Sequence, residues 1–408
     1  MLYILFLGGG LKMKRIIFHI DVNNAFLSWT AVELLRQGYP VDIRTIPSVI
    51  GGDEEQRRGI VLAKSPVAKS KGVVTAEPLF QARRKAPGLE VFPADHSLYK
   101  RESDKLYEYF CTLTPVVERY SVDECFLDFT GTSYLYDDYF VLAKNMREYI
   151  NDNFGITVNI GIAENRLCAK MASDFEKPNK IHTLFRHEVV KKMWPLQVDD
   201  LFMIGRKSAV ILHQLGIHTI GDLAKADAVL LSKYFKNQAS RMIESAHGID
   251  NSLVCFKESK EKSISVSETL SEDVVDISKL KEVLLFQSDK VARSARRDGL
   301  YARVVAIILK NSSFVNYSHQ KKLVNPTNAT EEVYKIACEL LKNTWKGEPI
   351  RLIGIRLADF TSSNQKQVSL FESESEKTVD KLQTVIDNIN DKYGNMKVMP
   401  ASMKKDKN

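Results

Sequence analysis

Residues 120–128, with the sequence YSVDECFLD, form the stretch on which the fold and the chemistry of this chain depend. The run is rich in β-branched and aromatic residues, a composition that predicts a strand rather than a loop. Two adjacent acids, Asp123 and Glu124, interrupt it, and carboxylates in apolar surroundings are costly unless a cation meets them. Because neighbours in a regular strand point to opposite faces, the two acids share a ligand only at a tight hairpin bend. A divalent metal such as Mg²⁺ is the predicted ligand, and the alternative is a solvated acidic turn.

The length and composition of the chain limit the class of protein. At 408 residues and 44% hydrophobic content, the chain predicts roughly two to four folded domains. The formal net charge of +7 is spread along the chain and favours a polyanionic partner. The five cysteines form no CxxC pair and no metal-ligand spacing, so we expect reduced thiols that serve packing.

The apolar start of the chain does not predict a membrane anchor. Residues 1–7 are too few to span a bilayer, lack a positive flank and lead into three glycines. We therefore expect neither secretion nor membrane association. Met13 precedes the first predicted strand and is a second candidate initiator, so we expect residues 1–12 to be a disordered extension.

The order of elements around the acidic hairpin indicates the fold. A short apolar strand over 16–20 ends in Asp21, a position from which an acid usually faces a site. The other predicted elements are helices over 98–110 and 138–152, a strand over 156–162 and a helix with Leu167, Met171 and Phe175 on one stripe. Strand, helix, hairpin, helix and strand in this order match a ferredoxin-like βαββαβ sheet with an insertion after the first strand. On such a sheet Asp21 and the acidic hairpin lie on neighbouring strands.

Two further patterns have alternative interpretations. Residues 57–74 alternate basic and small or apolar positions, which suits a phosphate cradle, although a solvated face is the ordinary role of a charge run. The segment Gly51–Glu55 is similar to the signature hairpin of diguanylate cyclases, whose palm-like fold also holds two metals. Glu55 stands where that signature has an aromatic residue, and no strongly apolar strand follows directly. We therefore expect an exposed loop there.

Four segments together resemble the serial motifs of the Y-family translesion DNA polymerases, in particular the bacterial DNA polymerase IV and ultraviolet-mutagenesis type. They are DVNNAF (21–26), SVDECFLD (121–128), NIGIA (159–163) and AKMASDFEKPN (169–179), and their order and spacing agree across residues 13–360. The resemblance implies an α+β multidomain fold, a right-hand polymerase with a ferredoxin-like palm. The implied parts are palm (13–24 and 95–184), fingers (25–94), helical thumb (185–252), linker (253–262), little finger (263–361) and tail (362–408).

The resemblance also implies roles for single residues around the acidic hairpin. Two Mg²⁺ ions would be held by the catalytic carboxylates Asp21, Asp123 and Glu124 together with the backbone carbonyl of Val22. Phe26 would be the steric gate against the 2′-hydroxyl of a ribonucleotide. The other residues implied to line the nucleotide site are Ala25, Lys69, Ser121 and Lys177.

Four positions depart from the family pattern. Ala25 stands where an aromatic residue is common, Asn23 where aspartate is frequent, and Pro66 where many relatives have a tyrosine that binds the triphosphate. Lys69 replaces an arginine, which exchanges a bidentate fork for a point charge. The metal site is untouched, so we expect activity to survive and nucleotide affinity to change.

Basic residues of the thumb and little finger are the predicted contacts with DNA. Residues 201–217 resemble a helix-hairpin-helix, whose turn and helix N-terminus bind phosphate without reading sequence, although Met203 replaces the first glycine of the usual pair. The little finger follows as strand 263–270, helix 278–298, strands 302–310 and 321–324, helix 330–344 and strand 350–357, a βαββαβ order. The predicted DNA contacts are Gly205, Arg206 and Lys207 in the thumb and Arg293, Arg296, Arg297 and Arg303 in the little finger.

The tail contains a short peptide that resembles the bacterial sliding-clamp binding motif. In residues 367–371, QVSLF, Gln367 is the polar pin and Leu370 and Phe371 are the anchors. An edge strand or a hydrophobic clip that folds back on the body is the alternative. A helix is predicted after it, over 377–392.

The sequence therefore predicts a template-directed DNA polymerase that transfers dNTPs to the primer 3′-hydroxyl of primer-template DNA. We expect low-fidelity translesion synthesis by a monomer in the bacterial cytoplasm, associated with the nucleoid. No extra acid-rich module is evident, so we expect no proofreading. The alternative is a polymerase-like DNA-binding accessory without chemistry, which would lack the carboxylates that are present here.

Overall fold

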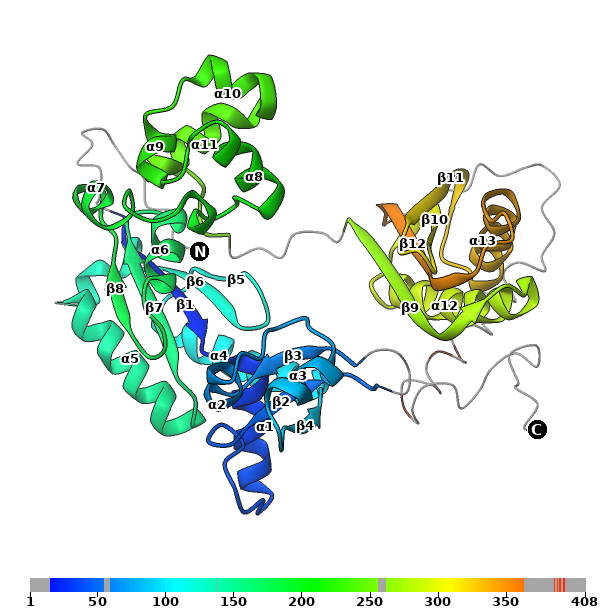
Figure 1. Cartoon of the computed structure of the whole chain (residues 1–408), viewed down its shortest axis with the longest axis horizontal. Helices are drawn as coiled ribbons and strands as arrows, with labels where there is room; N and C mark the ends of the chain where they lie inside the picture. The colour runs from blue at the N-terminus through cyan, green and yellow to red at the C-terminus, as the bar shows by residue number, and fades with distance from the viewer. Residues whose placement is uncertain are drawn as a thin grey trace. The chain divides into compact units, whose positions relative to one another are not determined.

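The computed structural model of this chain describes residues 15–54, 59–136, 138–255 and 262–362, together with Val385, Asp387, Ile389 and Lys392. The chain forms two compact units, Met1–Gly52 with Ile60–Glu258, and Asp53–Gly59 with Ser259–Asn408 (Figure 1). Among the described residues, no helix has both the length and the apolar character needed to cross a membrane.

A five-stranded sheet forms the centre of the first unit. The hairpin of β5 and β6 pairs through β6 with β1, and β1 pairs in turn with β7. Together with α4 and α5 this is the ferredoxin-like arrangement that the sequence predicts, and β8 extends it in parallel with β7. The strand order is β5 (Val117–Arg119), β6 (Glu124–Asp128), β1 (Ile17–Val22), β7 (Val158–Ala163) and β8 (Ile181–Thr183), with α4 at His96–Leu113 and α5 at Tyr139–Phe154.

The central strand β1 separates two cores. Its residues Phe18, Ile20 and Val22 pack with apolar side chains of α4 and α5 on one face of the sheet. Ile17 belongs to the core on the other face, which α6 (Arg166–Asp174) shares with the helices that follow. Because side chains alternate along a strand, His19 and Asp21 are also directed to the α6 face.

Helix α6 lies unusually close to β7 because residue 161 is glycine. A Cβ atom at Gly161 would lie 2.0 Å from the carbonyl oxygen of Ala169 and 2.5 Å from the amide nitrogen of Ser173. Both neighbours are backbone atoms of α6, so no side-chain rotation relieves the clash. This close approach brings Lys170 of α6 over the end of β1.

The residues between β1 and α4, for which the sequence predicts fingers, form an insertion with a sheet of its own. Helix α1 follows β1 directly, and the small sheet of the fingers has the order β3-β2-β4. Of the exposed loop expected over 51–55, Asp53 and Glu54 are exposed, whereas Gly51 ends β2 and is buried and Gly52 is partly buried. Glu55 lies outside the described residues. The elements are α1 (Ala25–Arg36), β2 (Ser48–Gly51), β3 (Val61–Lys64), α2 (Pro66–Ser70), α3 (Leu79–Lys85) and β4 (Glu90–Pro93).

Short helices complete the first unit. They share one apolar core with α6 and group together in Figure 1. Met203 has a positive φ of 77°, the backbone conformation that glycine adopts most readily, at the position where the predicted hairpin usually has glycine. The helices are α7 (Val189–Lys192), α8 (Arg206–Gln214), α9 (Ile220–Ala224), α10 (Ala228–Phe235) and α11 (Gln238–Ala246), with 3₁₀ turns at Thr130–Leu135, Arg186–Glu188 and Val198–Asp200.

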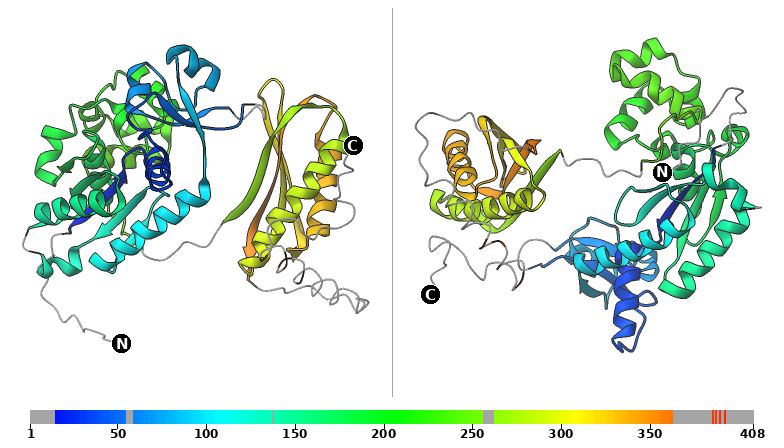
Figure 2. Two further views of the ribbon diagram at one scale, coloured as in Figure 1. Left: turned by 90° about the horizontal axis from the view of Figure 1, so that it is seen from below. Right: turned by 180° about the vertical axis from the view of Figure 1, so that it is seen from behind.

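The second unit has the βαββαβ element order that the sequence predicts. Its four antiparallel strands follow the order β11-β10-β12-β9, which differs from the order in the first sheet. Figure 2 shows the two helices against one face of this sheet, where they build its core. The elements are β9 (Ser263–Val274), α12 (Ile277–Arg297), β10 (Tyr301–Asn311), β11 (Asn316–Thr327), α13 (Thr330–Thr344) and β12 (Ile350–Thr361).

The five cysteines are free thiols that differ in burial, and Cys338 is partly buried. Cys125 and Cys168 are buried, and burial raises the pKa of each to about 12. Cys111 and Cys255 are exposed, so the prediction that all five serve packing is wrong for these two.

The Gly161→Ala variant tests the close packing of α6. Its Cβ would overlap the Ala169 carbonyl, so we expect the free energy of unfolding to fall by about 3 kcal/mol, the upper range for overpacking. The matched control is Gly131→Ala, where an added Cβ meets no atom within 4 Å, and there we expect a change within about 0.5 kcal/mol. Urea unfolding followed by circular dichroism measures both, and equal midpoints for the two variants would contradict the packing argument.

Candidate active site

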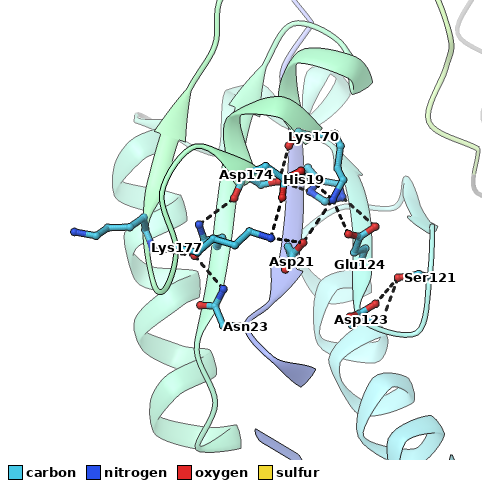
Figure 3. A network of polar contacts seen from close by, with 12 residues as sticks. His19, Asp21, Asn23, Ser121, Asp123, Glu124, Lys170, Asp174 and Lys177 are labelled. Carbon is cyan, nitrogen blue, oxygen red and sulfur yellow. Dashed lines mark hydrogen bonds and ion pairs between the residues drawn. The ribbon is translucent and has the colours of Figure 1, made fainter. Parts of the chain in front are cut away.

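The centre of the candidate site is a pair of carboxylates on neighbouring strands. Asp21 of β1 and Glu124 of β6 are direct register partners in the antiparallel ladder. Partners in such a ladder project to the same face, so both side chains point toward α6 (Figure 3). Asp21 is 8% exposed, which makes an uncompensated charge there costly. The predicted neighbouring positions of Asp21 and the acidic hairpin are therefore confirmed.

Two lysines compensate these charges. The Nζ atom of Lys170 lies 2.6 Å from Oε1 of Glu124 and 3.5 Å from Oδ2 of Asp21. The Nζ atom of Lys177 lies 3.0 Å from the same Asp21 oxygen. Both ammonium groups also contact the carboxylate of Asp174, at 3.3 Å from Lys170 and 2.8 Å from Lys177.

The pKa shifts at this centre reflect burial opposed by pairing. Burial lowers the pKa of Lys170, but the hydrogen bond to Glu124 and the nearby carboxylates outweigh it and raise the pKa well above its ordinary value. The pKa of Lys177 is also raised, because Asp21 and Asp174 outweigh its burial. Burial raises the pKa of Glu124, and the contact with Lys170 opposes that shift.

Asp123 is not part of the carboxylate pair in this structure. It lies in the bend before β6, and its Oδ1 accepts a hydrogen bond of 2.6 Å from the Ser121 hydroxyl. Figure 3 shows its side chain turned toward Ser121 and away from Asp21 and Glu124. In the part of the chain that the structure describes, no group of three His, Cys, Asp or Glu side chains is placed to hold a metal.

The donor set nevertheless fits a hard divalent cation. Asp21 and Glu124 present carboxylate oxygens that converge from two rigid strands, and the oxygens are already in contact with cationic groups. Oxygen ligands of this kind are those that Mg²⁺ prefers. Asp123 stands in the bend directly before the strand that begins with Glu124, so it is the nearest further carboxylate in the sequence.

His19 is a neighbour of the site that the sequence did not indicate. It is fully buried on the Asp21 face of β1, and its Nδ1 lies 2.8 Å from the Ser173 hydroxyl. Ser173 donates its own hydrogen to the Lys170 carbonyl, so Nδ1 of His19 is the donor to Ser173. Burial and then the charge of Lys170 hold the pKa of His19 well below its ordinary value, so the ring is neutral. His19 could have been identified from the sequence, because residues two positions apart in a strand share a face and His19 is two positions before Asp21.

Asn159 fixes the loop that carries Lys177, a second role that the sequence did not indicate. The fully buried amide donates to the carbonyls of Ser173 (2.9 Å) and Glu176 (2.6 Å). Its oxygen accepts from the side chain of Asn23 (3.1 Å) and from the Lys180 backbone. The Asn23 oxygen in turn accepts from the backbone of residue 179. This amide network holds residues 176–180 against the end of β1.

The predicted steric gate has a fixed orientation. The ring of Phe26 stacks on Tyr99 with centroids 4.3 Å apart and an interplanar angle of 8°. Tyr99 is buried, and its hydroxyl is 3.1 Å from that of Thr30, so the platform under Phe26 is itself held in place. Ala25 is buried beside it. Lys69 lies on α2 in the fingers and is exposed.

Several of the predicted DNA contacts are exposed at the surface of the two units. Gly205 is the N-cap of α8, and Arg206 and Lys207 are exposed in its first turn. Arg297 and Arg303 of the second unit are also exposed.

Three of the predicted arginines have intramolecular partners, and exposed Arg297 contacts Asp298 at 3.4 Å. Arg293 pairs with Asp289 at 2.9 Å. Arg296 binds both carboxylate oxygens of Asp387, at 2.6 and 3.0 Å, and donates to the Asn328 carbonyl. These contacts give Arg296 a structural role, although the sequence predicted a DNA contact. Residues 367–371 and 1–12 lie outside the described residues.

Comparisons with known proteins agree with the geometry. The chain matches the impB/mucB/samB family over residues 20–174 and the impB/mucB/samB family C-terminal domain over residues 261–370. It is 42% identical over 387 residues to DNA polymerase IV of Clostridium acetobutylicum, covering 95% of this chain and 98% of that protein. It is 36% identical to DNA polymerase IV of Alkaliphilus oremlandii, covering 96% and 99%. A solved Y-family DNA polymerase chimera, Dbh-Dpo4(243-245)-Dbh, has the same fold, with a TM-score of 0.75 at 23% identity, covering 85% of this chain and 100% of that chain.

The Asn23→Asp variant tests the amide network. The amide of Asn23 donates to the Asn159 oxygen, and a carboxylate there would instead set two acceptors against each other. We expect the free energy of unfolding to fall by about 1–3 kcal/mol, the cost of a buried polar group left without its partner. Asn251→Asp, at an exposed position, is the control and should melt with the wild type. A melting temperature for Asn23→Asp equal to that of the control would show that the Asn23–Asn159 hydrogen bond does not contribute to stability.

Proposed function

This chain belongs to the impB/mucB/samB family of Y-family DNA polymerases, of the DNA polymerase IV type, and from that premise we propose which of its residues carry out the reaction. It is a DNA-directed DNA polymerase of translesion synthesis, and its substrates are DNA and dNTPs. The observation that carries the residue assignment is the cross-strand pair of Asp21 and Glu124, held under the lysines of α6 and of the loop after it. The alternative of a protein that binds DNA without chemistry has no support in this arrangement.

The metal ions of the reaction are assigned to the carboxylate pair. Asp21 and Glu124 would hold two Mg²⁺ ions, with Asp123, released from Ser121, and the Val22 carbonyl as further ligands. When bound, Mg²⁺ would supply activation of the primer 3′-hydroxyl and compensation of the charge on the leaving pyrophosphate. The chain itself contributes position and electrostatics, since phosphoryl transfer needs little other protein chemistry.

The nucleotide is held from two sides. Lys177 of the palm and Lys69 of the fingers contact the triphosphate as point charges, which is why Lys69 orients it less strictly than an arginine would. Phe26, stacked on Tyr99, excludes the ribose 2′-hydroxyl. Ala25 and Ser121 line the site without taking part in the chemistry.

Remote contacts hold the DNA. The N-terminus of α8, with Gly205, Arg206 and Lys207, binds a backbone phosphate, because helix N-termini present free N–H groups and a positive dipole end. Exposed Arg297 and Arg303 add phosphate contacts in the second unit, with Arg293 and Arg296 acting mainly inside it.

A sliding clamp is the proposed protein partner. This proposal is supported by the sequence of the peptide that contains Gln367, Leu370 and Phe371. Tethering to a ring on DNA raises the local enzyme concentration, which suits a monomer that dissociates after few additions. The protein would act in the bacterial cytoplasm, close to the nucleoid.

Asp21→Asn and Glu124→Gln test the proposed function. Each removes a metal ligand with little change in shape, so we expect single-nucleotide addition to slow by about 10³-fold or more, the equivalent of about 4 kcal/mol. Binding of primer-template DNA, measured by fluorescence anisotropy, should stay within about threefold, because phosphate contacts elsewhere hold it. Glu176→Gln, an exposed acid of the same loop region, is the control and should extend normally. Rapid extension by both active-site variants would remove the metal assignment.

Phe26→Ala tests the gate. Loss of the ring leaves space over Tyr99, and we expect discrimination against ribonucleotides in kcat/KM to fall by at least about tenfold. Phe140→Ala, which removes a half-exposed ring from α5, is the matched control and should discriminate as the wild type does. Unchanged discrimination by Phe26→Ala would place the gate at another residue.

A further inference from the structure

Lys170 is the most buried cation of the site, and neither the motif resemblance nor the proposed mechanism uses it. Its side chain is 10% exposed, and its ammonium group contacts carboxylates from three elements. These are Glu124 of β6 at 2.6 Å, Asp21 of β1 at 3.5 Å and Asp174 of α6 at 3.3 Å. In Figure 3 it lies over the carboxylate pair.

The position of this ammonium group conflicts with metal binding. The Lys170 Nζ atom contacts one oxygen of Glu124 and one of Asp21, which are the two residues assigned to the metal ions. Three carboxylates and two ammonium groups make a centre with a charge of about −1, so the charges nearly balance without metal. A divalent ion that enters must therefore compete with the lysine for these oxygens.

Asp174 offers Lys170 a place to move to. It lies one helical turn along α6, is 43% exposed, and already contacts the ammonium of Lys170. Lys177 shares Asp174 at 2.8 Å, so removal of Lys177 to a triphosphate would leave the Asp174 carboxylate to Lys170 alone.

We propose that Lys170 is a displaceable internal cation, which holds Asp21 and Glu124 together in the metal-free enzyme and withdraws to Asp174 when metal binds. This proposal rests on the proposed function, since the metal site is the one assigned above. Lys170 is thus a positioning residue that sets the metal affinity of the enzyme. It keeps the carboxylates apposed during folding and makes metal binding weaker than the bare carboxylates would allow.

Mn²⁺ binding to the full chain, measured by electron paramagnetic resonance without nucleotide or DNA, tests the proposal. Lys170→Met should bind Mn²⁺ about tenfold or more tightly than the wild type, because no ammonium group competes for the oxygens. The same variant should melt at a lower temperature in EDTA, where the two carboxylates repel each other. Lys180→Met, which removes an exposed charge of the same loop region, is the control and should leave both values unchanged.

A double-mutant cycle separates displacement from a static effect of charge. If Lys170 moves to Asp174, Asp174→Asn weakens Mn²⁺ binding in the wild type and has a much smaller effect in the Lys170→Met background. Additive effects of the two substitutions, or an unchanged Mn²⁺ affinity of Lys170→Met, would overturn the proposal.

Mn²⁺ binding by the Lys170→Arg and Asp21→Asn variants completes the experiment. Lys170→Arg retains the charge and can pair with a carboxylate through two N–H groups, so it should bind Mn²⁺ more weakly than the wild type even if Lys170→Met does not fold. Affinity equal to that of the wild type would count against displacement. The Asp21→Asn variant tests the metal site separately from the role of Lys170. Wild-type Mn²⁺ affinity in that variant would show that Asp21 is not a metal ligand.

Discussion

The register pairing of Asp21 with Glu124 is the constraint on which the rest of the first unit depends. Two carboxylates on facing strands repel each other, and the apolar cores on both sides of β1 prevent their full solvation. The chain meets this cost by bringing α6 over the strand ends, which only a glycine at position 161 permits. The lysines of that helix and of the loop after it then supply the compensating charges.

The same arrangement places fold stability and catalysis in opposition. Lysines that neutralise the carboxylates stabilise this end of the sheet, whereas the mechanism proposed above assigns the same oxygens to metal and Lys177 to the triphosphate. In that mechanism, substrate and metal replace interactions that stabilise the free enzyme. An ammonium group suits such an exchange, since it binds as a compact point charge and moves on a flexible stem.

The sequence predicted those features that depend on local pattern. The apolar run ending in Asp21, the amphipathic helix over 98–110 and the order of elements around the hairpin predicted the palm, because periodicity is a property of neighbouring residues. Features that depend on partners distant in sequence were missed. His19 meets Ser173 across 154 positions, and Arg296 meets Asp387 across 91. The orientation of Asp123 toward Ser121 is local, yet the sequence predicted Asp123 as a metal ligand and did not indicate the hydrogen bond from Ser121.

One departure from the family pattern, Asn23, belongs to the amide network beside the carboxylate pair. Asn23, at a position where aspartate is frequent, donates its amide hydrogen to Asn159, which in turn uses its own amide to hold the carbonyls of Ser173 and Glu176. An ionised aspartate at position 23 has no hydrogen to donate to the oxygen of Asn159. If the Asn159 amide rotated by 180° to present its NH₂ group to that aspartate, it would lose its hydrogen bonds to the carbonyls of Ser173 and Glu176. In this chain Asn23 therefore has a structural role, as the donor to the oxygen of Asn159. The loop that carries Lys177 takes its position from this network of amide hydrogen bonds, so the orientation of Lys177 depends on the residue at position 23.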